Sequence, residues 1–340
     1  MGNFVRNLWY VAGWCDDFAG RPVARTIIGD PVVLYRRSDG ELVALADRCV
    51  HRMAPLSLGR VEGDELRCMY HGLRFASDGR CTQIPGQDMI PDQARLRVYP
   101  VVEKNSWVWV WMGDPERADA ARIPDPKALD DPAWVLRTGS MTYAANYELI
   151  NDNLLDLAHL AFVHATSFGA DEVWSQIPAK IEKLPEGVRS SRWITNTRPI
   201  PPLGEAARHD LVDIWTSYDF LMPGIFLLYT SIHPVGTAAA CGGQAPATPG
   251  LFDNFTSQAV TPVGDRASVY YYSWGPRAGH GDGAMAQAMV DIASGAFEED
   301  RTMIEAQQRI IDGDLSARPM PVAADKGITL FHRMMATQDR

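Results

Sequence analysis

The sequence predicts an α+β protein of two domains: an N-terminal antiparallel β domain at residues 1–115, and a second domain at residues 116–340 with a curved antiparallel sheet flanked by helices. The first domain is predicted by short β-rich runs that alternate with turn signals between Trp9 and Trp111. The second is predicted by two segments of helical periodicity on either side of several moderately alternating runs. A chain of 340 residues is long enough for two domains, each with its own core.

Short runs of β-forming residues, separated by Ser-Asp-Gly turns, account for the first domain. The clearest of these runs are Pro31–Tyr35, Leu42–Ala46 and Ser106–Trp111. The last run places Trp107, Trp109 and Trp111 on one face, which favours a position in the core. Proline, glycine and aspartate then accumulate between Gly113 and Pro132 while periodicity lapses, so this stretch is predicted to be a linker.

The second domain is predicted to begin with a helix and to end with another. Leucine and alanine recur at helical spacing over Tyr147–Val163, and helical periodicity returns over residues 284–312. The strand-like runs between them are Val188–Thr195, Leu211–Tyr218, Gly224–Ile232, Ser257–Thr261 and Ala267–Trp274. After Pro319 we expect a shorter, irregular tail.

Composition excludes several classes of protein. A formal net charge of -10 and a pI near 5.3 argue against nucleic-acid binding, which needs a basic surface. The longest apolar run, Phe220–Tyr229, is interrupted by Pro223 and Gly224 and is too short to span a bilayer. The N-terminus shows no secretory signal, and five cysteines are too few for a disulfide scaffold. These features predict a cytoplasmic protein without a membrane partner.

The chemistry of the first domain centres on two short motifs, Cys49-Val50-His51 and Cys68-Met69-Tyr70-His71. Two thiols and two imidazoles in two loops predict a metal site with Cys49, His51, Cys68 and His71 as ligands. Such a set suits either zinc or a 2Fe-2S cluster with two histidines on one iron. Colour separates the two alternatives, since an iron–sulfur protein of this kind is brown and a zinc protein is colourless.

The residues around these motifs favour the iron–sulfur cluster. Residues 49–56 and 68–73 resemble the Rieske iron–sulfur family, whose two halves contain Cys-X-His and Cys-X-X-His before a glycine. The resemblance implies that one iron takes both cysteines and the other takes both histidines. Some Rieske proteins of respiratory chains carry an additional cysteine in each loop, joined as a disulfide, but Ala54 and Tyr70 stand here instead. The cluster therefore resembles the oxygenase kind.

The first helix of the second domain carries a second candidate site. Asn153, Asp156 and His159 are spaced by three and would form one polar stripe among leucines. Burying unpaired polar groups is costly, and a metal would satisfy them. His164 lies five residues beyond His159, so we expect the helix to end or kink between the two histidines. The alternative is that the histidines cap or line a core independently.

The later helix supplies a carboxylate. Its apolar face contains Met289, Phe297, Met303 and Ile304, and Asp300 falls inside this face. An inward carboxylate requires a partner, which could be a structural salt bridge or a metal. His159, His164 and Asp300 together match the two-histidine, one-carboxylate triad of non-heme Fe(II) oxygenases, which leaves coordination positions open for dioxygen.

The two sites together resemble the Rieske non-heme iron oxygenases over nearly the whole chain, and most of all the oxygenase subunits of the vanillate O-demethylase, dicamba monooxygenase and toluenesulfonate methyl monooxygenase group. The resemblance implies a homotrimer, a flavin and iron–sulfur reductase with or without a ferredoxin, and NAD(P)H used only through that reductase. It implies that Asp156 bridges His71 of a neighbouring subunit to His159. Asn153 would sit near the iron as a weak ligand or a supporting group.

The resemblance implies a monooxygenase that hydroxylates a methyl or O-methyl group of an aromatic acid with dioxygen, with O-demethylation and formaldehyde release favoured. The alternatives are dihydroxylation of an aromatic ring, hydroxylation of a non-aromatic substrate such as a steroid or alkaloid, and a Rieske electron carrier without catalysis. We expect the pocket to be lined from residues 165–175, Leu221–Ile232, Phe255–Gln258 and 284–300. The sequence identifies neither the substrate nor the residue that binds its acid group.

Overall fold

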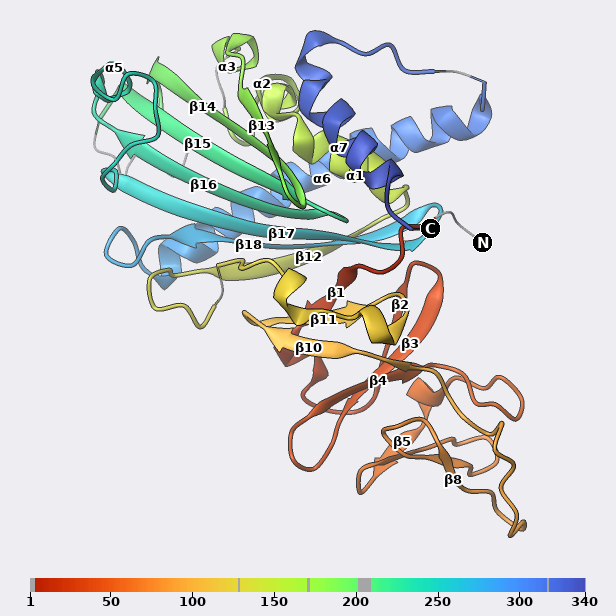
Figure 1. Cartoon of the computed structure of the whole chain (residues 1–340). Coiled ribbons are helices and arrows are strands. Elements are labelled where there is room, and N and C mark those ends of the chain that lie inside the picture. Colours follow the sequence, from red (N-terminus) through yellow and green to blue (C-terminus); the bar gives the residue numbers. More distant parts are fainter. Residues whose placement is uncertain (1–3, 128, 170–171, 201–208, 317, 340) are drawn as a thin grey trace. The chain divides into compact units, whose positions relative to one another are not determined.

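The computed structural model describes most of the chain, namely residues 4–127, 129–169, 172–200, 209–316 and 318–339. It separates into two compact units (Figure 1). The first unit holds residues 4–124 with 261–264 and 339, and the second holds residues 125–260 and 265–338. The predicted α+β class, with a β-rich N-terminal part followed by a large antiparallel sheet with helices, is confirmed. The predicted boundary between residues 115 and 116 stays a prediction.

Three small antiparallel sheets make up the first unit, with the strand orders β1-β11-β10, β2-β3-β4-β9 and β5-β6-β7-β8. The strands are β1 (Trp9–Trp14), β2 (Val23–Ile27), β3 (Asp30–Arg36), β4 (Leu42–Ala46), β5 (Arg60–Glu62), β6 (Glu65–Arg67), β7 (Arg74–Phe75), β8 (Cys81–Gln83), β9 (Val98–Tyr99), β10 (Val101–Lys104) and β11 (Trp107–Trp111). Short 3-10 turns lie between strands at η1 (Cys15–Phe18) and η2 (Leu56–Leu58), and two more follow β11 at η3 (Pro115–Arg117) and η4 (Ala120–Arg122). The predicted runs at residues 31–35, 42–46 and 106–111 are confirmed as strands.

The three tryptophans of β11 lie in the core of the first unit, as predicted. Trp107, Trp109 and Trp111 are each 0% exposed, because β11 is the central strand between β1 and β10. The Trp107 and Trp109 rings stack with their centroids 5.5 Å apart. Alternate residues of a strand share one face, so this spacing follows directly from the sequence.

Trp109→Ala should destabilise the first unit by about 3–5 kcal/mol, because truncating a fully buried tryptophan removes its burial and leaves a cavity. The measurement is the denaturant midpoint at which the visible absorption of the bound cluster disappears. Leu58→Ala is the matched control in the same unit, since Leu58 is 76% exposed and should change stability by no more than about 0.5 kcal/mol. Equal midpoints for the two variants would contradict the core assignment.

One antiparallel sheet of seven strands organises the second unit, in the order β12-β18-β17-β16-β15-β14-β13. Its strands are β12 (Arg137–Tyr143), β13 (Lys180–Leu184), β14 (Gly187–Thr197), β15 (Val212–Leu221), β16 (Ile225–His233), β17 (Phe252–Gly264) and β18 (Ala267–Pro276). All five predicted runs are confirmed as strands, whereas the edge strands β12 and β13 were not predicted. The apolar run at 220–229 is a hairpin whose turn contains the predicted Pro223 and Gly224.

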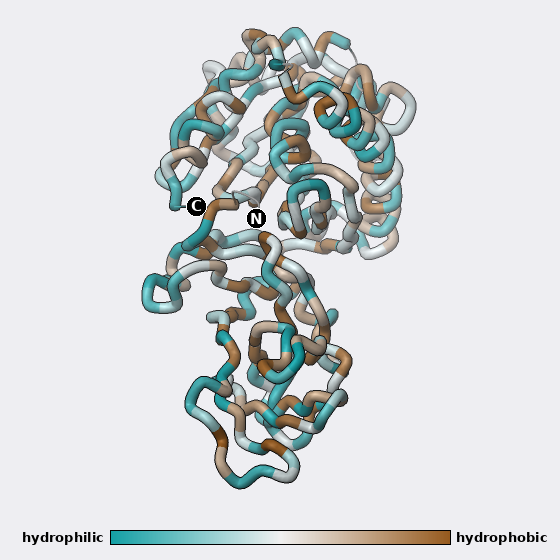
Figure 2. The backbone as a smooth tube through the Cα atoms, turned by 90° about the vertical axis from the view of Figure 1, so that its right-hand side faces the viewer, coloured by the Kyte–Doolittle hydropathy of each residue, from teal (hydrophilic) through white to brown (hydrophobic). Residues whose placement is uncertain are grey.

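The helices of the second unit are α1 (Tyr147–Leu155), η5 (Leu157–His159), α2 (Leu160–Val163), α3 (Val173–Gln176), α5 (Thr237–Ala240), α6 (Gly283–Gly313), η6 (Ala323–Asp325) and α7 (Lys326–Ala336). The long helix α6 packs against β12 and β18, and α7 packs against β13 and β14. Figure 2 shows apolar and polar stretches alternating along the chain, as expected for elements with one buried face. No described helix is long and apolar enough to cross a membrane.

Three sequence-based expectations for the helices were wrong. The predicted helix over 147–163 is interrupted at Asp156, whose carboxylate caps η5. The tail after Pro319 contains α7, which buries Phe331, Met334 and Met335; its eleven residues are too short for periodicity to identify with certainty. Met303, expected on the apolar face of α6, is 57% exposed. It lies about 100° around the helix from the buried Ile304 and about 60° from Asp300, at the edge of the buried face.

Candidate metal centres and pocket

Two loops of matching geometry carry the cysteine and histidine motifs of the first unit. In one loop the Cys49 N–H donates to the Ala54 carbonyl (2.8 Å) and the Met53 N–H donates to the Cys49 carbonyl (2.9 Å). In the other loop Cys68 and Leu73 are joined in the same way (2.8 Å), as are Gly72 and Cys68 (3.0 Å). The fourth residue after each cysteine, Met53 or Gly72, has a positive φ. The two loops therefore present their side chains as a matched pair.

In these two loops the cysteines are buried and the histidines are exposed. Cys49 and Cys68 are 1% and 2% exposed, whereas His51 and His71 are exposed, with ring centroids 4.6 Å apart. Burial is the main cause that raises the pKa of the Cys49 thiol to about 11, reinforced by Cys68. Buried thiols beside each other become thiolates when a cation binds them. The arrangement fits a 2Fe-2S cluster with an inner iron on the cysteines and an outer iron on the histidines.

The second candidate centre depends on the break in the helix at Asp156. On a continuous helix, two residues five apart point about 140° away from each other. The Asp156 carboxylate instead accepts a hydrogen bond from the Ala158 N–H (2.8 Å), so α1 stops there and a 3-10 turn carries His159. His164 then caps the end of α2. The helix does break, but the break precedes His159, so the expected position between the two histidines was wrong.

This turn brings both imidazoles to Asp300 on α6. The Nε2 atoms of His159 and His164 lie 3.6 and 3.2 Å from the Asp300 Oδ1 atom. One ligand atom from each of the three residues lies within 4.8 Å of the others. Ligands at right angles about a metal, each about 2.1 Å from it, are separated by about 3 Å. Among the described residues these three form the group suited to a mononuclear iron.

Two further side chains hold these three residues in place. The Asn153 Nδ2 atom donates to the Asp300 Oδ1 atom (3.0 Å). The His164 Nδ1 atom lies 2.8 Å from the Glu299 Oε2 atom, and the Ser167 hydroxyl donates to the same oxygen (2.7 Å). A carboxylate on the far nitrogen of a metal-binding histidine fixes its tautomer and orientation. Sequence analysis did not single out Glu299, whose only signal is that it precedes Asp300.

The His159 ring is held by the backbone instead of a carboxylate. Its Nδ1 atom lies 2.5 Å from the Asp156 carbonyl oxygen. The hydrogen bond that caps the turn at Ala158 uses the Asp156 Oδ1 atom. The Oδ2 atom accepts no hydrogen bond from the described residues. Within one chain, therefore, Asp156 contacts His159 through its carbonyl group and keeps one carboxylate oxygen available.

The electrostatics of the group suit a cation. Burial lowers the pKa of His159, although Asp300 opposes this effect. Burial also disfavours a charged His164, but the Asp300 and Glu299 carboxylates outweigh it and raise the pKa of His164. Burial opposes ionisation of Glu299, but hydrogen bonds from His164 and Ser167 lower its pKa. The two carboxylates therefore attract positive charge to the position of the His164 ring, and a divalent metal bound between Asp300 and His164 would supply that charge.

Glu299→Gln should weaken Fe(II) binding at this group by about 10- to 100-fold, as is typical for the loss of a carboxylate that orients a metal-binding histidine. The measurement is a titration of Fe(II) into holoprotein whose chelatable iron has been removed. Glu298→Gln is the matched control on the same helix, since Glu298 is exposed and pairs with Arg301. Equal Fe(II) affinity in both variants would rule out the orienting role of Glu299.

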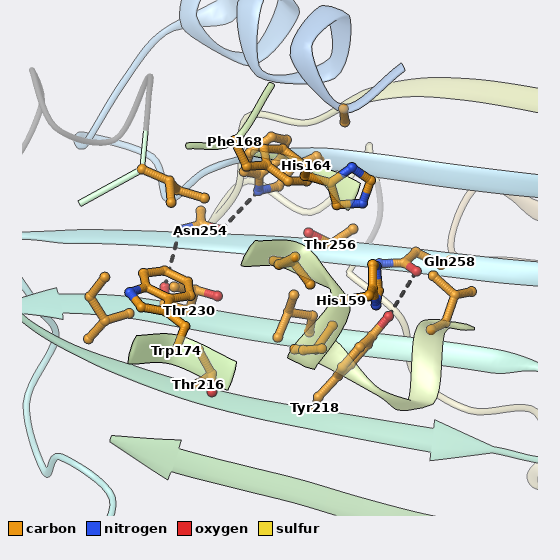
Figure 3. A pocket seen from close by; sticks show the side chains of 18 of the residues that line it. His159, His164, Phe168, Trp174, Thr216, Tyr218, Thr230, Asn254, Thr256 and Gln258 are labelled. Carbon is orange, nitrogen blue, oxygen red and sulfur yellow. Dashed lines mark hydrogen bonds between the residues drawn. The ribbon is translucent and has the colours of Figure 1, made fainter. Parts of the chain in front are cut away.

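An apolar pocket is lined in part by His159 and His164 (Figure 3). It measures about 120 Å³. His159, His164 and Asp300 lie in its wall, together with Leu154, Phe168, Trp174 and other apolar side chains. At one side the Tyr218 hydroxyl donates to the Gln258 Oε1 atom (2.9 Å). A dry wall with few polar groups is typical of a site for a small organic ligand.

Each segment expected to line the pocket contributes to it. The 165–175 segment supplies Phe168 and Trp174, β16 supplies Leu228 and Thr230, β17 supplies Thr256 and Gln258, and α6 supplies Ala293 and Phe297. Sequence analysis missed the contributions of β14, β15 and β18, including Arg192, Thr216 and Trp274. Arg192 shares its strand face with Val188 and Ile194, which are both 0% exposed. An arginine on an otherwise apolar strand face was the signal by which the sequence could have identified Arg192 as a pocket residue.

Comparison with known protein families follows the same division of the chain. Residues 8–100 match the Rieske [2Fe-2S] domain, and residues 143–338 match the vanillate O-demethylase oxygenase C-terminal domain. A cluster-binding domain joined to this catalytic domain defines the Rieske non-heme iron oxygenases, and the chain belongs to that family. It acts as the oxygenase component of a multicomponent monooxygenase, which implies a reductase partner.

Several curated relatives cover most of the chain. The iron–sulfur subunit of the toluene-4-sulfonate monooxygenase system of Comamonas testosteroni is 41% identical and covers 96% of this chain and 94% of its own. A vanillate O-demethylase oxygenase subunit of a Pseudomonas species is 34% identical, with coverage of 90% and 86%. The oxygenase component of dicamba O-demethylase of Stenotrophomonas maltophilia is 31% identical, with coverage of 90% and 88%.

Solved structures of dicamba monooxygenase share the fold. The complex with 3,6-dichlorosalicylic acid has a TM-score of 0.90 at 28% identity and covers 98% of this chain and 97% of its own. The structure with non-heme iron and dicamba has a TM-score of 0.79 at 27% identity over the same shares of the two chains. The fold described above is therefore that of a Rieske oxygenase subunit.

Proposed function

We propose that this chain hydroxylates a methyl or O-methyl carbon of a small aromatic acid, with O-demethylation and release of formaldehyde favoured. The observation that carries the proposal is the apolar pocket whose wall contains His159, His164 and Asp300. The named relatives support the substrate class, since they are enzymes of toluene-4-sulfonate, vanillate and dicamba. The toluenesulfonate relative, at 41% identity, favours hydroxylation of an aryl methyl group as the second candidate reaction.

The size of the pocket supports a substrate with one ring. An apolar cavity of about 150 Å³ takes up benzene, and the pocket at about 120 Å³ is of the same order. Phe168, Trp174 and Leu228 supply flat or branched apolar surface for such a ring. A steroid or alkaloid with several fused rings is much larger, so a single ring is favoured over those alternatives.

His159, His164 and Asp300 would hold the iron, and Cys49, His51, Cys68 and His71 would hold the cluster. Iron with three protein ligands keeps positions open for dioxygen and supplies the oxidising chemistry. Glu299 and Asn153 fix the imidazole and carboxylate groups before substrate enters. The apolar wall excludes water, which would otherwise compete at the open positions. Hydroxylation of an O-methyl carbon produces a hemiacetal, which breaks down to a phenol and formaldehyde.

We further propose a homotrimer in which Asp156 connects His159 to His71 of the neighbouring subunit. Two observations support this arrangement. The His51 and His71 rings are exposed, beside Met69 and Tyr70, which are 51% and 63% exposed. The Asp156 carbonyl contacts His159, while its Oδ2 atom accepts no hydrogen bond from the described residues. The bridge would therefore use the carbonyl group toward His159 and the carboxylate toward the partner.

The reductase is proposed to be a flavin and iron–sulfur protein, with or without a ferredoxin, that draws electrons from NAD(P)H. The cytoplasm is the proposed compartment. None of the five cysteines is in a disulfide, which fits a reducing environment.

The test is a panel of methoxy- and methyl-substituted aromatic acids offered to the holoenzyme with a surrogate reductase, while oxygen uptake and products are followed. Formaldehyde formed in proportion to oxygen uptake supports O-demethylation, and a benzylic alcohol supports methyl hydroxylation. A cis-diol would instead indicate ring dihydroxylation. Oxygen uptake that no member of the panel stimulates would contradict the proposed substrate class.

A further inference from the structure

A row of polar side chains crosses the apolar pocket, and it starts at an arginine. Arg192 of β14 pairs with Thr216 of β15, Thr216 pairs with Thr230 of β16, and Thr230 pairs with Asn254 of β17. Residues that pair across antiparallel strands place their side chains on the same face of the sheet. All four line the pocket, where Thr216, Thr230 and Asn254 lie near one another (Figure 3).

The neighbouring rows of the same pocket wall are less polar. On one side Ile194 pairs with Ile214, and on the other side Tyr218 pairs with Leu228. These residues also line the pocket. The polar row is therefore a local feature of an otherwise apolar wall, and such isolated polar groups usually orient a ligand.

Arg192 carries a charge that nothing described in the chain neutralises at close range. Its Nη1 atom donates to the Trp174 and Ile177 carbonyls (3.0 and 2.9 Å), which fixes the guanidinium plane. Among the described residues, no carboxylate oxygen lies within 4.0 Å of a guanidinium nitrogen of Arg192, which is the distance limit for an ion pair. Burial lowers the pKa of Arg192, with a weaker opposing attraction from Asp156, yet a guanidinium remains charged at neutral pH. A half-buried cation of this kind favours an anionic ligand.

Donors for such an anion are present beside the guanidinium. Among the described residues, the Nε and Nη2 atoms of Arg192 form no hydrogen bond. The same holds for the hydroxyls of Thr216 and Thr230, since the hydrogen bond at Thr230 is accepted by its backbone carbonyl. The Asn254 amide is already oriented, because its Oδ1 atom accepts from the Trp274 indole N–H (2.9 Å) and its Nδ2 atom donates to the Thr230 carbonyl (3.4 Å). Planar guanidinium groups bind carboxylate and sulfonate oxygens through two parallel hydrogen bonds.

Resting on the proposed function, we infer that Arg192, assisted by the Thr216 and Thr230 hydroxyls, binds the acid group of the aromatic substrate, a sulfonate or a carboxylate. Arg192 is then a specificity-determining residue. Anchoring the acid group at this row fixes which ring substituent reaches the His159, His164 and Asp300 wall. A substrate without an acid group would leave the guanidinium buried and unpaired, so it would be discriminated against.

The test is equilibrium binding to the intact holoenzyme without dioxygen, measured by calorimetry. The probes are para-toluenesulfonate, para-toluate and the uncharged para-toluenesulfonamide. Arg192→Met should weaken binding of the better anion by about 10- to 100-fold, which is the effect of losing hydrogen bonds to a charged group. Binding of the sulfonamide should not change. Arg192→Lys should retain part of the preference, because it keeps the charge without the planar fork.

Arg189→Met is the matched control on the same strand. Arg189 points away from the pocket lining and pairs with Asp219, so this variant should bind all probes as the wild type does. Thr216→Val tests the row by an almost isosteric change and should weaken anion binding by about 3- to 10-fold. Visible cluster absorption and iron content verify that each variant is folded.

Two results would overturn the inference: anion binding that survives both Arg192→Met and Thr216→Val, or equal weakening of the anions and the sulfonamide, which would mean that Arg192 only shapes the pocket. The relative effects on the two anions identify which acid group the row prefers. Failure of the proposed function is distinguishable, because it is measured by product formation in the wild type, whereas this test measures binding in the variants.

Discussion

Asp300→Ala should remove the mononuclear iron while the brown cluster survives. The Asp300 Oδ1 atom lies within 3.6 Å of the Nε2 atoms of both His159 and His164, and alanine leaves two histidines without the anionic ligand. We expect Fe(II) affinity at this group to fall by more than about 100-fold, the upper end of the loss seen for residues that only support a ligand. Substrate-dependent oxygen uptake should be lost with it.

The readouts are Fe(II) titration of chelator-treated protein, visible absorption of the cluster, and oxygen uptake. Asp291→Ala is the matched control, since Asp291 is exposed on the same helix and its carboxylate accepts a hydrogen bond from the Gln287 side chain (2.9 Å). This control should bind iron as the wild type does. Undiminished Fe(II) binding by Asp300→Ala would remove Asp300 from the ligand set and return it to the role of a structural acid.

Asp156→Asn should leave both metal centres occupied and nearly stop oxygen consumption. Asparagine caps a helix as well as aspartate does, so the turn at Ala158 and the carbonyl contact to His159 are kept. In the proposed trimer, the substitution removes the negative charge that Asp156 would offer to the neighbouring subunit's cluster. Losing one partner of a buried, charged hydrogen bond costs about 2–5 kcal/mol, or roughly 30- to 5000-fold in rate.

Iron content, cluster absorption and oxygen uptake with a surrogate reductase test this expectation. Asp152→Asn is the control, because Asp152 lies on the helix α1 that ends at Asp156 and its carboxylate pairs with His332 instead of the metal-binding residues. It should retain wild-type uptake. A fully active Asp156→Asn enzyme would contradict the bridge between subunits, whatever the metal content of the variant.

The parts of the fold that follow simple periodicity could be predicted from sequence. The strands β14 to β18 coincide with β-forming runs of the sequence, the helix α6 shows helical periodicity, and Asp300 was placed correctly on the buried face of α6. The edge strand β12 lies across from β18, and its partly exposed residues give little apolar alternation. Helix α7 was missed because it is short and follows a stretch without periodicity.

Residues whose role depends on a contact with a distant part of the chain, or on a local break in a helix, were the hardest to predict. The break at Asp156 results from a side-chain cap that competes with the continuing helix, and apolar spacing on both sides conceals it. Glu299 is one of two consecutive glutamates, and only the three-dimensional structure shows which of them reaches His164. The polar row that begins at Arg192 depends on the register of four strands, which the sequence of one strand does not contain.

The central claim is that the chain holds an electron-accepting cluster and a separate catalytic iron. It is tested most directly by counting iron and acid-labile sulfide in holoprotein prepared without oxygen, before and after brief treatment with an Fe(II) chelator. We expect about three irons and two sulfides per chain, of which the chelator removes about one iron while the brown absorption remains. About two irons per chain, with none removable without loss of colour, would contradict the claim and leave an electron carrier.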